Sequence, residues 1–116
     1  MKIFVFGANR AGRHGKGAAL FAKTYRGAVV GQGEGLQGHS YGIPTKDENV
    51  RTLSLNEIEK HVNTFIEFAI NNPSLQFQLT PIGCGLAGYT PEQIAPFFRN
   101  APKNVELPVE FLNVLS

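Results

Sequence analysis

Glycines placed where a strand meets a helix are the residues whose type and spacing most directly indicate chemistry. Gly7-Ala8-Asn9 follows an apolar, strand-like run, and Gly15-Lys16-Gly17 opens a segment whose apolar residues have helical spacing. A glycine-rich loop at a helix start presents unpaired backbone N–H donors and the positive end of the helix dipole, which together stabilise phosphate. Lys16 adds a positive charge there. The spacing is neither a Walker loop nor a GxGxxG fingerprint, and a plain tight turn is the alternative interpretation.

A second glycine-rich segment lies between another strand-like run and another helix start. It comprises Gly83, Cys84, Gly85, Leu86, Ala87, Gly88 and Tyr89. In open α/β sheets, ligands bind outside the carboxyl ends of the strands. We therefore expect residues 7–17 and 83–89 to lie side by side and to form one crevice for a phosphate-bearing small molecule.

Histidine and cysteine offer fewer candidates. His14 and His39 lie in glycine loops, where each can act as a general acid or base, and a solvent-exposed or phosphate-binding histidine is the alternative. Cys84 is expected to be packed beside the second loop, with a reactive thiol as the alternative. No spacing of histidine and cysteine indicates a structural metal site, so neither a metal nor a cofactor is expected.

Basic residues are concentrated near the N-terminus. The net charge is only +2, but the first 33 residues contain six basic residues and no acid, and the first acid is Glu34. This asymmetry favours an anionic partner, although a solvated basic face balanced by acids elsewhere has the same composition. Nucleic-acid binding is a third and weaker hypothesis, because no interleaved aromatic residues and no nucleic-acid-binding motif accompany the charge.

The chain length of 116 residues fits a single domain, residues 1–116. Cys84 is the only cysteine, which excludes an intramolecular disulfide and favours a reducing compartment. No apolar run approaches the ~20 residues of a membrane helix, and the apolar run at the N-terminus is too short for a signal peptide. We therefore expect a cytoplasmic protein without a membrane partner.

The hydrophobic pattern predicts alternating strands and helices around the two loops. Apolar runs predict strands over residues 3–6, 28–30, 40–43, 77–80 and 105–107. Helical spacing predicts three helices: one that ends at Gly27, one that begins at the Ser54–Glu57 capping box, and one that begins at Thr90 and is shortened or bent by Pro96. The order β-α-β-β-α-β-α-β predicts an α/β fold with helices packed on a central, at least partly parallel sheet.

Four of these segments, in this order, resemble motifs of the macro-domain superfamily. They are Asn9 after a strand, the helix-opening Gly15-Lys16-Gly17-Ala18-Ala19, the stretch Tyr41-Gly42-Ile43-Pro44-Thr45-Lys46, and Ile82-Gly83-Cys84-Gly85-Leu86. The resemblance is strongest to the branch that contains terminal ADP-ribose protein glycohydrolases, and it spans residues 3–98. It implies a compact three-layer α/β/α fold with a mixed central sheet. Segments 12–17 and 33–38 also resemble those of small uncharacterised bacterial and phage proteins.

The resemblance implies roles for individual residues. Asn9 matches the asparagine that contacts the distal ribose, residues 15–17 match the loop at that ribose and the diphosphate, and residues 83–88 match the second diphosphate-binding loop. Lys46 matches the lysine that the glycohydrolase branch uses covalently, as a nucleophile on the ribose. That branch also has an aspartate where this chain has Ala87. The upstream strand and the aspartate that recognise adenine in macro domains have no counterpart here, so base specificity is left open.

Two functions from different classes follow. The first is a binding module for ADP-ribose or a related nucleotide. The second is a hydrolase that removes ADP-ribose from a conjugate, such as an ADP-ribosylated macromolecule, through Lys46 or a nearby acid such as Asp47 or Glu48. The alanine at the position of the aspartate favours the binding module or a divergent hydrolase.

Overall fold

The apolar run near the N-terminus forms the central strand of a five-stranded sheet. In a computed structural model, which describes residues 1–116, β1 (Ile3–Asn9) lies between β3 (Ser40–Lys46) and β4 (Phe77–Leu79) and is parallel to both. β5 (Val105–Glu106) extends the sheet in parallel beyond β4, and β2 (Gly35–Gln37) pairs antiparallel with β3 at the other edge. The strand order is therefore β2-β3-β1-β4-β5.

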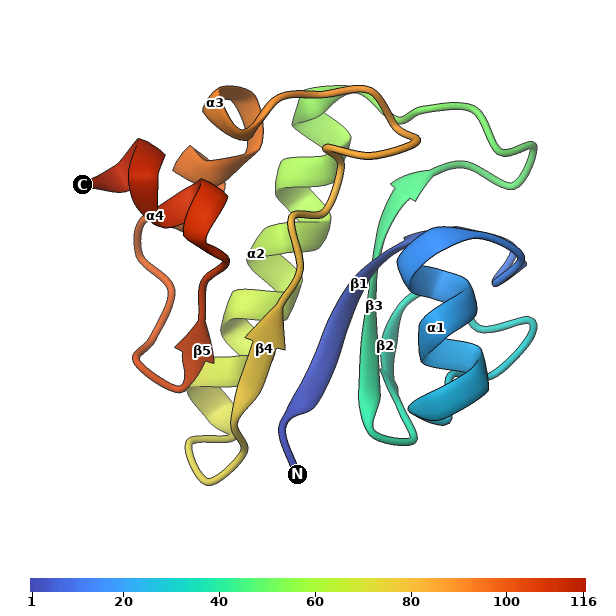
Figure 1. The fold of residues 1–116 in the computed structure, drawn as a ribbon, viewed down its shortest axis with the longest axis horizontal. Coiled ribbons are helices and arrows are strands. Elements are labelled where there is room, and N and C mark those ends of the chain that lie inside the picture. The colour runs from blue at the N-terminus through green and yellow to red at the C-terminus, as the bar shows by residue number, and fades with distance from the viewer.

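Helices cover both faces of this sheet (Figure 1). One face carries α1 (Gly17–Tyr25), whose small residues Ala19 and Ala22 pack against Phe6 and Ala8 of β1. The other face carries α2 (Leu55–Asn71), α3 (Pro91–Ile94), the 3₁₀ helix η1 (Ala95–Phe98) and α4 (Val109–Leu115). The predicted three-layer α/β fold with a mixed central sheet is confirmed.

The two faces are buried to very different extents. The cluster under α2 contains 17 buried apolar residues, whereas the cluster under α1 contains five. Aromatic rings dominate the larger cluster, with Phe65 packed edge-on against Phe77 at 5.3 Å and Phe98 stacked on Phe111 at 5.7 Å between ring centroids. Most of the hydrophobic stabilisation therefore lies on the α2 face, because it scales with the apolar area removed from water.

Local start and stop patterns agree with the structure. The Ser54 hydroxyl accepts the backbone N–H of Glu57 at 3.2 Å, and the Glu57 carboxylate accepts the backbone N–H of Ser54. The predicted capping box therefore begins α2. Gly27 follows α1 with a φ of +76°, which glycine adopts without a Cβ clash. Pro96 follows a four-residue α3, after which the chain continues as the 3₁₀ helix.

Three predictions about secondary structure are wrong or incomplete. Residues 28–30 are not a strand, because Ala28 packs beneath α1 while Val29 and Val30 are exposed in a loop. The strand that precedes β3 is instead β2, which the sequence pattern did not predict. Pro44 does not end its strand. It pairs with Ala8 beside a register shift between β1 and β3, the kind of site where a sheet tolerates proline. The apolar pattern predicts no element over residues 109–115, yet they form α4, whose Phe111 is fully buried.

Candidate functional site

The carboxyl end of β1 is where the chain leaves the sheet in opposite directions. β1 leads into α1 on one face, whereas its neighbours β3 and β4 lead into α2 and α3 on the other face (Figure 1). The loops that follow β1 and β4 therefore diverge and leave a crevice between them. Open α/β sheets bind ligands at such a point.

A pocket of about 790 Å³ occupies this crevice. Most of the site residues predicted from the sequence line it, namely Gly7, Asn9, Gly15, Lys16, Gly17, Lys46, Gly83, Cys84, Gly85, Leu86 and Ala87. Gly88 and Tyr89 do not line it. The two glycine-rich loops thus border one cavity, as expected from their placement between strands and helices.

The start of α1 is the part of the pocket suited to an anion. Its N-cap residue, Lys16, is extended and makes no side-chain capping hydrogen bond, and the first turn contains no acid. The backbone N–H groups of this turn have no partner within the helix and carry the positive end of its dipole. Arg13 and Lys16 are exposed, line the pocket and form no ion pair with an acidic side chain. At the start of α3, in contrast, the Gln93 side chain accepts the backbone N–H of Thr90 at 2.9 Å.

Asn9 shapes the first loop. Its Oδ1 accepts the backbone N–H of Arg13 at 2.9 Å and its Nδ2 donates to the Arg13 carbonyl at 2.9 Å. The Asn9 side chain thus binds both backbone polar groups of Arg13 and closes the turn between the two residues. A side-chain amide has two N–H donors, so one hydrogen of Nδ2 stays available to a ligand. Asn9 also pairs with Lys46 across β1 and β3, which places both residues at the same edge of the sheet.

The second loop is held against the loop that joins β3 to α2. The Thr52 hydroxyl donates to the carbonyl of Ala87 at 3.1 Å, and the Tyr89 hydroxyl donates to the carbonyl of Leu53 at 2.6 Å. Tyr89 therefore supports the pocket from outside rather than lining it. Gly85 lies at the open side of this loop, where a Cβ atom would meet no other atom within 4 Å. A side chain added at Gly85, which lines the cavity, would consequently meet open space.

The acid in the pocket is one that the sequence pattern did not indicate. Glu110, from α4, lines the cavity together with Lys46, whereas Asp47 and Glu48 do not. The Asp47 carboxylate accepts the backbone N–H groups of Arg51 and Asn49, and these bonds, that of Arg51 above all, lower its pKa. Its role is to close a turn. Other lining residues that were not named as site residues are Arg13, Thr45, Val50 and Thr80.

Cys84 has the character of a packed residue. Burial raises the pKa of its thiol to about 11, and the nearby carboxylates of Glu110 and Glu92 add to the effect. The thiol donates to the carbonyl of Ile82 at 3.5 Å. At neutral pH it is therefore protonated, and the thiol lacks the thiolate form that a nucleophile requires.

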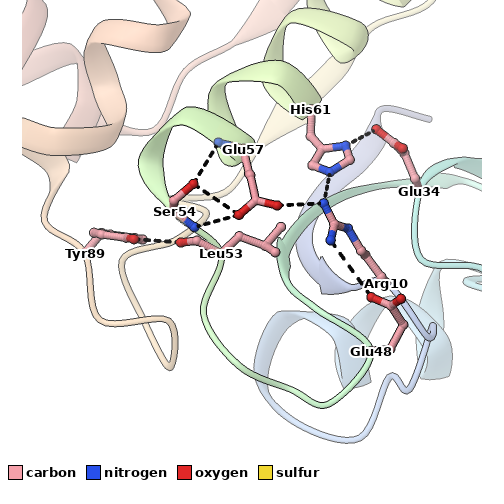
Figure 2. A network of polar contacts seen from close by, with 8 residues as sticks. All are labelled: Arg10, Glu34, Glu48, Leu53, Ser54, Glu57, His61 and Tyr89. Carbon is pink, nitrogen blue, oxygen red and sulfur yellow. Dashed lines mark hydrogen bonds and ion pairs between the residues drawn. The ribbon is translucent and has the colours of Figure 1, made fainter.

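Arg10 is tied into a polar network that joins the end of β1 to the start of α2 (Figure 2). Its guanidinium lies 3.2 Å from the Glu57 carboxylate, 4.0 Å from that of Glu48 and 3.5 Å from His61 Nε2. On the other side of the ring, His61 Nδ1 lies 2.8 Å from the Glu34 carboxylate. Arg10 therefore joins the end of β1 to the start of α2. His61 lies off the apolar stripe of α2, yet it is half-buried between Arg10 and Glu34.

Two pKa shifts accompany this network. Hydrogen bonds from Ser54, and then from Arg10, lower the pKa of Glu57. Burial raises the pKa of Tyr41 to about 12, and the charge of Glu34 adds to the shift. At neutral pH the Glu57 carboxylate is therefore ionised and the Tyr41 hydroxyl is neutral.

His14 is a core residue and lies outside the pocket lining. Only 2% of it is exposed, and it packs edge-on against Phe6. Its Nε2 lies 3.0 Å from the Val29 carbonyl and 3.2 Å from Gln37 Oε1. Both partners are acceptors, so Nε2 carries the proton. The expectation of a solvent-exposed loop histidine is therefore wrong for His14, while the exposed His39 lies in the β2–β3 turn.

The basic residues of the N-terminal third are divided between structure and pocket. Lys2 pairs with Glu106 at 3.2 Å, Arg10 is clamped by acids, and the Arg26 guanidinium lies over the ring of Phe21. Arg13 and Lys16 alone among them line the cavity. Two of the six basic residues therefore border the cavity, and the other four lie elsewhere.

No group of three or more His, Cys, Asp or Glu side chains is placed to hold a metal ion. None of the helices combines the length and apolar character needed to cross a membrane. No family model, curated protein sequence or solved structure matches this chain. The resemblance of its four motifs to macro domains therefore stays a prediction.

Proposed function

We propose that the pocket binds ADP-ribose or a related phosphate-bearing nucleotide. The observation that carries the proposal is the uncapped start of α1, flanked by Arg13 and Lys16, in a cavity that it shares with the open glycine-rich loop after β4. Unpaired donors, a helix dipole and two cations at one wall of a cavity are suited to a diphosphate. The volume of about 790 Å³ lies within the roughly 300–1,000 Å³ of small-molecule sites.

In this arrangement the phosphates lie between the two loops. Gly15 and Gly85 leave room for close approach, because a Cβ atom at either position would meet open space. Lys46, at the end of β3, extends the positive wall on the far side of Asn9. The donors and cations of the lining suit the phosphates, and the identity of the base is left open.

A panel of ligands tests the proposal. ADP-ribose, NAD, ADP, cyclic AMP and inorganic phosphate are added in turn, and the melting temperature is measured, because a ligand that binds only the native state raises it. We expect ADP-ribose or ADP to raise the melting temperature, and Arg13→Ala with Lys16→Ala to weaken binding more than tenfold. Lys60→Ala, on the exposed side of α2, is the matched control. Absence of a shift with every diphosphate would contradict the proposal.

A second candidate function, hydrolysis of an ADP-ribosyl conjugate, is favoured by one observation. Lys46 and Glu110 line the same cavity, and neither forms an ion pair. In this mechanism the Lys46 amine, after it loses a proton to solvent, attacks the ribose anomeric carbon, and the conjugate departs with the bonding electron pair and takes a proton from water or from the acid form of Glu110. Water then hydrolyses the amine–sugar adduct.

Borohydride reduction separates the enzyme from the binder. A covalent adduct on Lys46, detected by mass spectrometry and absent in Lys46→Ala, is the result expected of the hydrolase. If Lys46 only contacts phosphate, Lys46→Ala weakens binding by about 1.5–3 kcal/mol and no adduct forms. Turnover that survives Lys46→Ala would eliminate the lysine mechanism.

A further inference from the structure

Val50 is the one residue other than glycine with a positive φ, at +61°. This left-handed conformation crowds the Cβ atom of any L-residue, and a β-branched side chain suffers most. Val50 is also 44% exposed and belongs to neither core cluster. Burial in the core therefore does not compensate for the backbone strain at Val50.

The turn around Val50 is determined by hydrogen bonds that do not involve its side chain. The Asp47 carboxylate accepts the N–H groups of Asn49 and Arg51 at 2.8 and 2.9 Å, and the Val50 N–H donates to the Asp47 carbonyl at 3.1 Å. Glycine or asparagine would adopt this φ with less strain. Because the turn does not need valine, the side chain itself must have another use, and Val50 lines the pocket.

Leu86 is the counterpart of Val50 on the second loop. It is 69% exposed, a high value for a large apolar side chain, and it lines the same cavity. The hydrogen bonds from Thr52 to Ala87 and from Tyr89 to Leu53 fasten the two loops together. Two exposed apolar side chains thus line one pocket on loops that hydrogen bonds hold together, and the cationic start of α1 lines the same pocket.

We infer that Val50 and Leu86 form an apolar clamp for the uncharged ring portion of the ligand, its sugar or base. The inference rests on the proposed function, which places the phosphates at the start of α1. A ligand held there by its charge projects its ring system toward the other loops, where the clamp removes apolar surface from water. The strained backbone at Val50 is the conformation that aims its side chain into this space.

The experiment compares two diphosphates, one with rings and one without. Affinities of ADP-ribose and inorganic pyrophosphate are measured by calorimetry for the wild type, Val50→Asn and Leu86→Ala. We expect each variant to bind ADP-ribose about fivefold more weakly and pyrophosphate within about twofold of wild type. Val50→Asn should also raise the melting temperature by about 3 °C, because the left-handed strain is relieved. Val30→Asn and Leu112→Ala, exposed residues outside the pocket, are the matched controls and should change neither affinity.

The outcomes separate the clamp from the site. ADP-ribose affinity within twofold of wild type in both variants would overturn the clamp and leave the proposed function standing. Equal losses for ADP-ribose and pyrophosphate would also overturn it, because the two residues would then act on the phosphate site. A wild-type protein that binds neither diphosphate would overturn the proposed function and the clamp with it.

Discussion

Two groups of glycines have opposite surroundings in the structure. At Gly15 and Gly85, beside the pocket, a Cβ atom would meet no atom within 4 Å. At Gly33, in the loop before β2, a Cβ atom would overlap the carbonyl oxygen of Asn9 and lie 2.7 Å from that of Arg10. The Cβ of an alanine at Gly12 would similarly overlap the backbone of Gln32. The first group leaves space open, and the second fills it with the chain's own backbone.

This difference shows how the pocket is supported. Residues 31–35 press against the loop after β1, while the Asn9 amide closes that loop from within. Gly12 and Gly33 therefore approach the protein itself rather than a ligand. Composition alone does not distinguish the two groups, because an absent side chain serves both purposes.

The largest expected effect is on a packed glycine. Gly33→Ala should lower the free energy of unfolding by about 3 kcal/mol, because its methyl group displaces the backbone of β1 and the following loop. Urea denaturation measures the change. Gly85→Ala is the matched control and should stay within about 0.5 kcal/mol of wild type. Equal stability of the two variants would break the distinction between the groups.

The buried His14, in the loop between β1 and α1, provides a second test. His14→Leu preserves much of the volume but leaves the Val29 carbonyl and Gln37 Oε1 without this donor, so we expect a loss of about 2 kcal/mol. His39→Leu, in the exposed β2–β3 turn, should change stability by less than about 0.5 kcal/mol. Thermal or urea unfolding measures both. A catalytic role for His14 would instead show as lost activity with normal stability.

The third and smallest effect concerns Cys84, at the border of the pocket. Its pKa of about 11 means that the thiolate is scarce at pH 8, so iodoacetamide should label it about a hundredfold more slowly than a cysteine in an unfolded peptide. The rate should increase as the pH rises toward 11. Labelling as fast as that of the peptide would show that the Cys84 thiol is activated and would support a role as a nucleophile.

Local patterns predicted the frame of the site and its two loops. The apolar run of β1, the capping box at Ser54 and the placement of residues 83–87 before a helix start depend on neighbours in sequence, so the sequence alone reveals them. Glu110 and His14 could not be foreseen in the same way. Glu110 reaches the pocket only because α4 packs through Phe111 onto the core, and His14 is buried only because residues 28–37 fold over it.

The proposal that the crevice binds a diphosphate is tested most directly at Gly85. Gly85→Glu introduces a carboxylate at the lining of the cavity, where its negative charge opposes a diphosphate, while its Cβ meets no neighbouring atom. Calorimetry with ADP-ribose should show saturable one-to-one binding to the wild type and a loss of at least about a hundredfold in the variant, with the melting temperature of the free protein unchanged. Equal binding by the two proteins, or no binding by the wild type, would contradict the account.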